Sequence, residues 1–330
     1  MRVLIVDADH DLTALEKDFL RKERPEWQVD FLPLTTDRDA VLAAIREHDL
    51  LISAFTKLDA DFFAAPGELK AVSVNAIGFD TVDVDAAACA GVSVFSLTNY
   101  CTEEVAEHTV ALMMAITRRL LPYTDRQKTG VWSFMASPRP RRITGQTLAV
   151  FGFGRIGQAV ARRAMGLGMK ILAVDPFGPF STDRPENAWL KDVEFVSREE
   201  AFARADVISN HMAQTDENVH YFDAAAFSMM KKKPIFVNCA RGMAVDTEAL
   251  MAALRSGQIF GAGLDVLEEI RDAPELLSEG LNLIITPHAA FYSETSATKL
   301  AHDATWNLIH FTEDEPDEIT RVLVWKGVKK

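Results

Sequence analysis

The 330-residue chain is poor in cysteine, with three in all, and none of its apolar runs has the length of a membrane span. Cys89, Cys101 and Cys239 are too few and too scattered for a disulfide framework or a Cys-x-x-Cys zinc site, which favours a reducing compartment. The densest apolar run, around residues 110–116, is far shorter than the roughly 18 residues that a membrane helix needs. We therefore expect a soluble, cytoplasmic protein with no membrane partner and no metal site.

Positive charge is also scarce relative to negative charge. The chain has 35 Lys and Arg residues against 48 Asp and Glu residues, a formal net charge of −13 at pH 7. A surface that binds nucleic acid needs clustered Lys and Arg, so this balance argues against a nucleic-acid partner. With 48% apolar and 25% charged residues the composition is that of an ordinary globular protein, and the length predicts roughly two domains.

Short apolar runs alternate with helical patterns along nearly the whole chain, which predicts βαβ units and parallel sheets. Strands are predicted at 3–6, 50–54, 71–75 and 92–96, and again at 147–151, 171–175, 207–209, 235–239, 263–267 and 283–286. The first run is followed directly by acidic residues, which favours a strand over a signal peptide. Long helices are predicted over 102–120 and 293–311. Residues 129–144 break the periodicity and predict a loop, and the tail 319–330 is short and mixed.

The strongest local pattern is Gly152-Phe153-Gly154-Arg155-Ile156-Gly157, between the strand predicted at 147–151 and a helix predicted at 158–166. The first glycine allows a tight turn, the second lets the backbone approach a pyrophosphate, and the third allows the helix to pack closely on the strand. The helix N-terminus attracts the anion. A βα turn without a ligand is the alternative, but the complete pattern favours a dinucleotide bound at residues 152–157.

Asp175 ends the next predicted strand, roughly 18 residues after Gly157. A carboxylate at this place accepts hydrogen bonds from the adenosine ribose hydroxyls, and it repels the additional 2′-phosphate of NADP. The sequence therefore predicts NAD as the cofactor in preference to NADP. Arg184 is close enough in sequence to keep NADP open as the less favoured alternative.

Several further motifs follow one another along the chain: Asn75 to Asp83, Glu104 to Thr109, the glycine loop, Val237 to Gly242, Gly263 to Val266, and Thr286 to Tyr292. In these motifs the chain resembles the D-isomer-specific 2-hydroxyacid dehydrogenases, a family that includes D-lactate, phosphoglycerate and glyoxylate/hydroxypyruvate enzymes and the C-terminal-binding-protein corepressors. The resemblance implies an α/β fold of two Rossmann-like domains with parallel doubly wound sheets. It implies a substrate domain formed by 1–99 and 293–330, and an inserted NAD-binding domain at 100–292.

The resemblance also implies two groups that carry the reaction. Arg241 follows a predicted strand, and its guanidinium can bind a carboxylate through two hydrogen bonds and polarise the neighbouring ketone. Without the resemblance, a surface ion pair is the simpler interpretation of this arginine. His288 follows the last predicted strand, and its imidazole can donate a proton to the forming alkoxide and take it back in reverse.

The family pairs its histidine with a glutamate, and here the chain departs from the family pattern. The usual glutamate lies five positions after the aspartate of the Asp-Val pair, which places Ile270 at that position when counted from Asp265. A one-residue deletion places Glu269 there instead. We therefore predict Glu269 as the catalytic glutamate, with Glu268 as the reserve candidate.

The remaining implied roles concern binding. The backbone amides of Ile77 and Gly78 resemble the loop that binds the substrate carboxylate, and Asp265 resembles a residue on the nicotinamide side of the cofactor. The cofactor is also expected to contact Thr109, His211 and Ala240. Aromatic residues are candidates for the wall around the substrate side chain, with core packing an equal alternative for each: Phe55, Phe79, Tyr100, Phe291 and Tyr292.

The function implied is an NAD-dependent oxidoreductase that interconverts a 2-oxo acid and a D-2-hydroxy acid by hydride transfer. The alternative is a non-enzymatic NAD(H)-sensing partner-binding protein of the corepressor type, suggested by residues 78–80 and 291–294. A homodimer is expected from the family, with the predicted helix 102–120 as a candidate interface. The substrate side chain is not fixed by the sequence, although the aromatic candidates favour an apolar group over a phosphorylated one.

Overall fold

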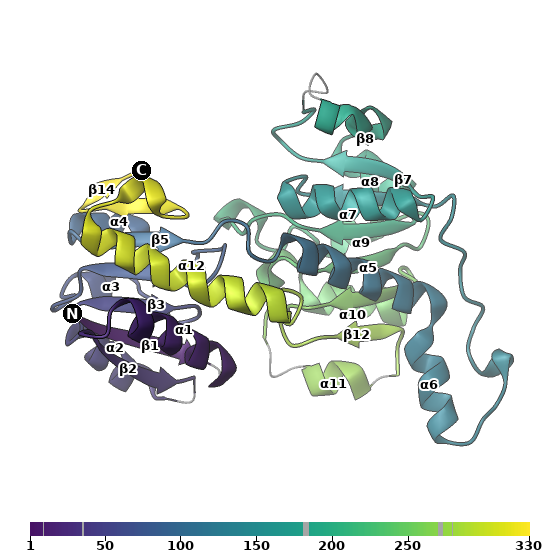
Figure 1. Cartoon of the computed structure of the whole chain (residues 1–330). Helices are drawn as coiled ribbons and strands as arrows, with labels where there is room; N and C mark the ends of the chain where they lie inside the picture. Colours follow the sequence, from purple (N-terminus) through teal and green to yellow (C-terminus); the bar gives the residue numbers. More distant parts are fainter. Residues whose placement is uncertain (9, 35, 181–184, 270–272, 279) are drawn as a thin grey trace. The chain divides into compact units, whose positions relative to one another are not determined.

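The structure of the chain, a computed structural model, describes residues 1–8, 10–34, 36–180, 185–269, 273–278 and 280–330. The chain divides into two compact units (Figure 1). Unit 1 comprises Met1–Tyr100 together with Tyr292–Lys330, and unit 2 comprises Cys101–Phe291. Within the described ranges, no helix combines the length and the apolar character needed to cross a membrane.

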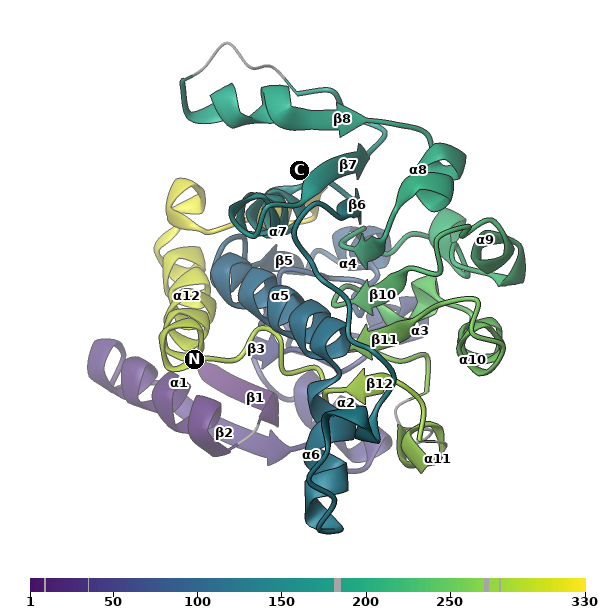
Figure 2. The same cartoon turned by 90° about the vertical axis from the view of Figure 1, so that its right-hand side faces the viewer.

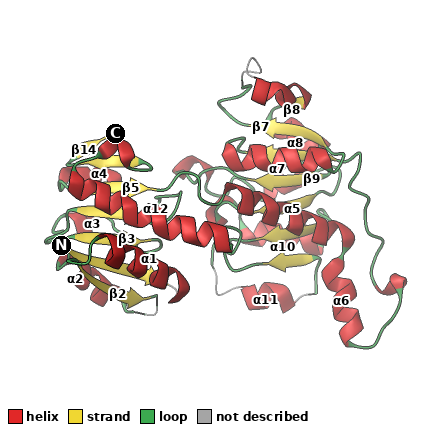
Figure 3. Ribbon diagram, in the orientation of Figure 1, coloured by secondary structure: helices red, strands yellow, loops and turns green. Residues whose placement is uncertain are grey.

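Unit 1 is built on a seven-stranded sheet in the order β14-β13-β5-β4-β3-β1-β2 (Figure 3). The strands are β1 (Arg2–Ala8), β2 (Gln28–Pro33), β3 (Leu50–Ser53), β4 (Ala71–Val74), β5 (Ser93–Ser96), β13 (Val322–Trp325) and β14 (Val328–Lys329). Strands β1 to β5 pair in parallel, whereas β13 runs antiparallel to β5 and β14 antiparallel to β13. Strands β3, β4 and β5 are buried along their whole length, as is typical of parallel strands covered on both faces.

Helices cover both faces of this sheet. On one face, α1 (His10–Glu23) packs beside α12 (Glu294–Glu313), which also contacts β3 and β4. On the other face, α2 (Arg38–Arg46), α3 (Ala60–Phe63) and α4 (Val84–Cys89) join a continuous apolar core. Each of these three helices begins after an aspartate whose carboxylate accepts hydrogen bonds from the first turn, which stabilises the helix start. A short 3₁₀ helix (Pro316–Glu318) follows α12 and precedes β13.

Unit 2 is built on a second seven-stranded sheet, in the order β12-β11-β10-β9-β6-β7-β8, in which all described pairings are parallel. The strands are β6 (Thr147–Phe151), β7 (Lys170–Val174), β8 (Val193–Phe195), β9 (Val207–Asn210), β10 (Ile235–Asn238), β11 (Gly261–Leu264) and β12 (Leu283–Ile285). The connection order reverses between β6 and β9. Ligands of open α/β sheets bind at the carboxyl ends of the strands at such a reversal.

The side chains of β6 alternate between two separate cores. Leu148 and Val150 pack with α5 (Thr102–Arg118) and α7 (Arg155–Gly166), whereas Phe151 packs on the opposite face. That opposite face is covered by α8 (Arg198–Arg204), α9 (Ala224–Ser228), α10 (Thr247–Arg255) and α11 (Ala273–Ser278). Figure 2 shows the two groups of helices on either side of the strands. The predicted α/β class with doubly wound parallel sheets is confirmed.

Several predicted elements differ from the observed ones. The helix predicted over 102–120 ends at Arg118, because Arg119 adopts a left-handed conformation with φ 52° before α6 (Leu120–Lys128) begins. The loop predicted at 129–144 contains a 3₁₀ turn, Phe134–Ala136. Strands β2, β8, β13 and β14 were not predicted. Strands β2, β8 and β14 lie at sheet edges and lack a continuous apolar run, whereas β13 is a four-residue apolar run within the short, mixed tail.

Candidate active site

The glycine loop lies at the carboxyl end of β6 and leads directly into α7. Gly152 has φ +83°, and a Cβ atom there would lie 2.6 Å from the carbonyl carbon of His211. A Cβ at Gly157 would lie 2.2 Å from the carbonyl oxygen of Gly152, so the start of α7 packs directly on the turn. Around Gly154, by contrast, a Cβ would meet no described atom within 4 Å. The first and third glycines are thus required by packing, and the second leaves room for a ligand at the N-terminus of α7.

Asp175, Arg155 and Ile156 lie at this same loop. The carboxylate of Asp175 accepts hydrogen bonds from the backbone of Phe153 at 2.7 Å and of Phe177 at 2.9 Å. The acid therefore sits against the glycine loop, where the ribose of a bound dinucleotide is expected. Arg155 and Ile156 form the first turn of α7. Arg184, the residue that kept NADP open, lies outside the described residues.

His211 follows β9 and contacts the glycine loop from the neighbouring strand. Its backbone amide donates to the carbonyl oxygen of Phe151 at 2.7 Å, and its Nε2 lies 2.7 Å from the hydroxyl of Ser209. Burial lowers the pKa of His211 to about 3, so the imidazole is neutral. A neutral, fixed ring is suited to line a cofactor site and unsuited to exchange protons near neutral pH.

Two buried asparagines, which the sequence analysis did not single out, hold the loops after β9 and β10. The side chain of Asn210 donates to Oδ1 of Asn238 at 3.1 Å. That same oxygen accepts from the amide of Ala240, and Nδ2 of Asn238 donates to the carbonyl oxygen of Arg241 at 2.9 Å. Polar residues at the ends of two buried neighbouring strands are the signal that could have identified this pair. They fix the backbone on which Ala240 and Arg241 lie.

Arg241 lies half-buried in the loop after β10, next to a close contact between two backbone segments. A Cβ at Gly242 would lie 2.0 Å from the carbonyl oxygen of Leu267, so only glycine fits there. One guanidinium nitrogen, Nη1, donates to the carbonyl oxygen of Ala240 at 3.0 Å. The Arg241 side chain thus leaves the carboxyl edge of the sheet close to the loop that follows β11.

Thr109 approaches the end of β10 from α5. Its hydroxyl donates to the carbonyl oxygen of Val105 at 2.7 Å, and it also hydrogen-bonds the thiol of Cys239. Burial raises the pKa of Cys239 to about 12, although the Thr109 hydrogen bond acts in the opposite direction, so the thiol stays protonated. This cysteine is a packing group and not a nucleophile.

His288 occupies an exposed turn after β12 and has a left-handed backbone, with φ 55°. Its amide donates to the carbonyl oxygen of Asp265 at 2.9 Å. The Asp265 carboxylate, buried beneath the turn, accepts from the hydroxyl of Thr286 at 2.6 Å and from the amides of Ala289 and Ala290, both at 2.9 Å. Asp265, predicted as a cofactor contact, therefore uses both oxygens to hold the turn that carries His288. The ring of Phe291 meets that of His288 edge-on, with centroids 6.2 Å apart.

The two candidate glutamates have different surroundings. Glu268 contacts Nε2 of His220 through Oε1, and Oε2 accepts from the amide of Thr247 at 2.7 Å. Burial alone would raise the pKa of Glu268, but the hydrogen bonds from Thr247 and His220 outweigh burial and lower it. Glu269 is exposed. Ile270, the position favoured by strict register, lies outside the described residues.

The substrate-binding candidates of unit 1 lie in loops after its strands, except Tyr292, which precedes α12. Phe55 is exposed, and its amide donates to the carboxylate of Asp7 at 2.9 Å. Ile77 and Gly78 follow β4 and are half-buried. Tyr100 is buried. Phe79 packs against the unit 1 core with the guanidinium of Arg321 5.0 Å from its ring, which favours the core-packing alternative for this residue, and Tyr292 is exposed.

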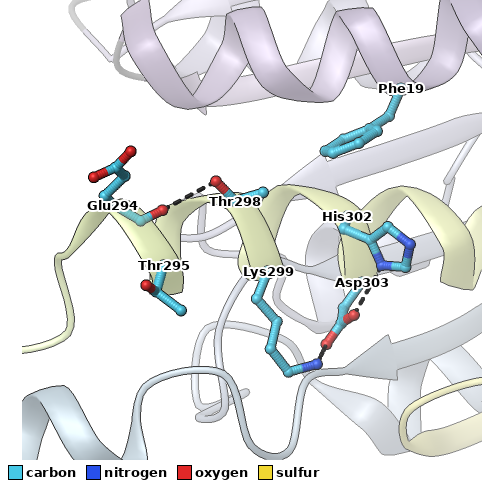
Figure 4. A pocket seen from close by; sticks show the side chains of 7 residues that line it. All are labelled: Phe19, Glu294, Thr295, Thr298, Lys299, His302 and Asp303. Atoms are coloured by element: carbon cyan, nitrogen blue, oxygen red, sulfur yellow. Dashed lines mark hydrogen bonds and ion pairs between the residues drawn. The ribbon is translucent and has the colours of Figure 1, made fainter.

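None of these residues lines the open depression on α12 that is drawn in Figure 4. Lys299 and His302 both contact the carboxylate of Asp303 there, at 2.6 and 3.1 Å. The hydroxyl of Thr298 donates to the backbone carbonyl of Glu294 at 3.0 Å. Because these polar groups bind one another, we assign no ligand to this depression.

Comparison with known proteins identifies the family. Residues 110–290, more than half of the chain, match the family model described as the NAD-binding domain of D-isomer-specific 2-hydroxyacid dehydrogenases. A glyoxylate reductase of Korarchaeum cryptofilum is 34% identical over 314 residues, which cover 93% of this chain and 91% of that protein. The apo structure of D-lactate dehydrogenase from Escherichia coli superposes with a TM-score of 0.81 at 27% identity, covering 98% of this chain and all of that one.

A further solved structure bears on the cofactor. The D-lactate dehydrogenase of Aquifex aeolicus, solved with NAD and lactic acid, has a TM-score of 0.84 at 27% identity and covers 98% of this chain and 99% of that one. The relatives are named as dehydrogenases and reductases, which favours the oxidoreductase over the corepressor alternative. The chain belongs to the D-isomer-specific 2-hydroxyacid dehydrogenase family and is an NAD-dependent oxidoreductase of that family.

Proposed function

We propose that the chain reduces a small 2-oxo acid to the D-2-hydroxy acid and catalyses the reverse reaction, with Arg241 and His288 as its principal catalytic residues. One observation carries the proposal. A chain of hydrogen bonds connects the two: Nδ2 of Asn238 donates to the Arg241 carbonyl, the Asp265 amide to the Asn238 carbonyl, and the His288 amide to the Asp265 carbonyl, each at 2.9 Å. The backbones of the proposed anion-binding arginine and the proposed acid/base are thus fixed relative to one another.

In this proposal Arg241 binds the substrate carboxylate and the ketone oxygen. A guanidinium is charged at every relevant pH, and its planar donors match the two oxygens of a carboxylate. The positive charge also stabilises the negative charge that develops on the ketone oxygen during reduction. Arg241 lies at the carboxyl edge of the unit 2 sheet, as these roles require.

His288 delivers the proton. As hydride reaches the carbonyl carbon, the carbonyl oxygen takes a proton from the imidazolium, and the neutral imidazole takes it back in oxidation. The exposed turn leaves the ring accessible, while Asp265 holds the backbone beneath it. We propose Glu269 as the residue that orients the imidazole, since the carboxylate of Glu268 is bound to His220 and Thr247.

The residues of unit 2 suit NAD, which when bound supplies or accepts the hydride. We propose that the backbone around Gly154 and the start of α7 receive the pyrophosphate and that Asp175 receives the adenosine ribose. Thr109, His211 and Ala240 would line the remainder of the dinucleotide. The carboxylate of Asp175 supports NAD over NADP, because a 2′-phosphate beside it would be repelled.

We also propose a cytoplasmic homodimer formed through the NAD-binding unit. Residues 120–135, which we call the apolar arm, expose several large apolar side chains, among them Trp132 at 90%, Phe134 at 84% and Met135 at 77% of their surface. Side chains of this kind are unusual in solvent when they cluster, and they are typical of interface centres. We propose that a second copy of this chain covers the apolar arm with its own NAD-binding unit, because members of the family commonly dimerise through this domain.

The test is a panel of 2-oxo acids with NADH and NADPH side by side, followed by the loss of reduced-cofactor absorbance. Glyoxylate, pyruvate, hydroxypyruvate, phenylpyruvate and branched 2-oxo acids span the sizes of side chain to be distinguished. We expect turnover with NADH and at least one of the small acids, glyoxylate first, because the 34% identical relative is named a glyoxylate reductase. No turnover across the panel would overturn the proposal.

A further inference from the structure

Glu16 is a buried acid that the proposed reaction does not use. It lies on α1 with no exposed surface, and Asn75, the first residue after β4, donates from Nδ2 to its Oε1 at 2.6 Å. Two further atoms of this pair, Oε2 of Glu16 and Oδ1 of Asn75, are also buried and accept no hydrogen bond from any described residue. An ionised carboxylate in this position would be a buried charge with a single hydrogen bond, which is costly.

A proton on Glu16 accounts for both of these oxygens. A neutral carboxylic acid has one O–H donor and one acceptor oxygen, and a primary amide has both a donor and an acceptor as well. The pair can therefore form two hydrogen bonds in opposite directions, from Nδ2 to Oε1 and from the Oε2 hydroxyl to Oδ1. An ionised Glu16 would instead leave two acceptor oxygens without a donor. Burial raises the pKa of Glu16 to about 8, although the Asn75 hydrogen bond acts in the opposite direction.

We propose that Glu16 is a positioning residue, which as a neutral acid holds the loop of residues 75–78 in place through Asn75. The backbone of this loop is fixed at two further points: the Asn75 amide donates to Ser53 at 2.8 Å, and the Leu97 amide donates to Ala76 at 3.0 Å. The Asn75 side chain adds the connection to α1. The inference rests on the proposed function and on the role that the family resemblance implies for the amides of Ile77 and Gly78 at the end of this loop, which is to bind the substrate carboxylate alongside Arg241.

The charged groups on neighbouring elements do not compensate an ionised Glu16. Within the described ranges, Asn75 is the only residue that makes a hydrogen bond or ion pair with it. Charged groups on the elements around α1 have partners other than Glu16. Lys299 and His302 contact Asp303 on α12, and Asp7 at the end of β1 binds residues 53–56. Asp30 on β2 binds His48, and Lys17 on α1 covers the ring of Phe31. Ionisation would therefore disrupt the pair with Asn75.

The kinetic consequence is a pH-dependent KM for the 2-oxo acid. If only the enzyme with neutral Glu16 holds the loop correctly, the apparent affinity falls in proportion to the neutral fraction. With a pKa of about 8, that fraction is about one tenth at pH 9, so this group alone raises KM about tenfold between pH 7 and pH 9.

The principal test is Glu16→Gln, which keeps an acceptor for Asn75 and supplies a permanent donor at every pH. We expect this variant to lose the alkaline rise in KM that the wild-type enzyme shows. Glu16→Leu, which cannot bond with Asn75, should have a raised KM at all pH values. Asp18→Asn, an exposed charge change on the same helix, should follow the wild type. If the KM profiles of wild type and Glu16→Gln coincide from pH 7 to pH 9, the positioning role is overturned.

A second measurement tests the protonation without any turnover. The native pKa of Glu16 is raised above the ordinary value of 4.5, so the native state binds more protons than the unfolded state between pH 4.5 and about 8. Stability of the wild type should therefore fall across this window relative to Glu16→Gln. A Tm difference that stays constant from pH 5 to pH 9 overturns the neutral acid. If no 2-oxo acid is turned over by any variant, the positioning role falls with the proposed function, while the Tm series and NADH binding by fluorescence still decide the protonation of Glu16 and the integrity of unit 2.

Discussion

Asp265 holds the left-handed turn at His288 through both its backbone carbonyl and its side-chain carboxylate. Its carbonyl oxygen accepts the His288 amide at 2.9 Å, while its buried carboxylate accepts the two following amides, of Ala289 and Ala290, also at 2.9 Å. A φ of 55° is unfavourable for a histidine, so the turn depends on these contacts. The position of His288, the proposed acid/base, therefore depends on an aspartate directly after the neighbouring strand β11.

Asp265→Asn tests this dependence. An amide has only one acceptor oxygen, so at least one of the two loop amides would face an NH₂ group and the His288 turn would shift. We expect kcat to fall about 10- to 100-fold, because small misplacements of a catalytic group have effects of this size. The free energy of unfolding of this variant should also be about 1–3 kcal/mol lower than that of the wild type, because buried amides lose their hydrogen-bond partners.

A matched control for Asp265→Asn is Asp223→Asn, which changes an aspartate that caps α9 of the same unit. It should leave kcat unchanged in steady-state assays. An Asp265→Asn enzyme with wild-type kcat would show that the turn does not need the carboxylate.

Gly152 and Gly154 allow the two roles of the glycine loop to be separated. Gly152→Ala introduces a Cβ 2.6 Å from the His211 backbone at a positive φ, so it should destabilise unit 2 by at least about 1 kcal/mol in chemical denaturation. The Cβ of Gly154→Ala would have no described atom within 4 Å, so this variant should retain the wild-type Tm. Its methyl group would occupy the space proposed for the pyrophosphate, and we expect NADH binding, measured by fluorescence, to weaken about tenfold or more. Unchanged NADH binding in Gly154→Ala would place the cofactor elsewhere.

Glu268 and His220 form a pair whose contribution to stability should depend on pH. The hydrogen bond to Glu268 is the main reason why the pKa of His220 is raised. The contribution of His220 to stability is therefore complete below its unfolded pKa of 6.5 and is lost as the pH rises through its native pKa. The pKa of Glu268 is lowered, so the contribution of Glu268 to stability is complete above its unfolded pKa of 4.5 and is lost as the pH falls through its native pKa. The pair should therefore stabilise most between about pH 4.5 and pH 6.5.

Glu268→Gln should accordingly reduce Tm most within that window and less at pH 8, with calorimetry as the measurement. Glu269→Gln is the matched variant: we expect it to leave the Tm profile unchanged and to alter the pH dependence of kcat. The opposite assignment, with Glu268→Gln changing the kcat profile and Glu269→Gln silent, would make Glu268 the partner of His288.

The elements predicted correctly are those whose burial leaves a continuous apolar run. Strands β3, β4, β9 and β10 are buried along their length, so composition alone reveals them. Strand β8, in contrast, has three residues and a half-exposed pattern at a sheet edge, and only its pairing with β7 makes it a strand. An edge strand such as β8 forms because it pairs with a neighbouring strand, and a local sequence pattern does not contain this information.

The site shows the same division. Arg241 and His288 could be proposed from the sequence because they occupy motif positions directly after predicted strands, and their catalytic roles stay predictions. Asn210, Asn238 and Glu16 were missed, because their function depends on which neighbours the fold brings to them. A glutamate on a helix predicts a solvated face, yet α1 turns Glu16 inward onto Asn75. Positioning residues of this kind become visible only when distances are known.

The apolar arm, residues 120–135, gives the prediction for assembly. Replacing both Trp132 and Phe134 by serine removes the two most exposed aromatic side chains of the arm, at 90% and 84%. If the arm lies in the dimer interface, the light-scattering mass should fall from twice the chain mass toward 36.6 kDa. Leu34→Ser, which removes an exposed apolar side chain from unit 1, should leave the mass unchanged. A double variant that stays dimeric would require an interface that does not use the arm, and α5, the other candidate, would then be tested in the same way.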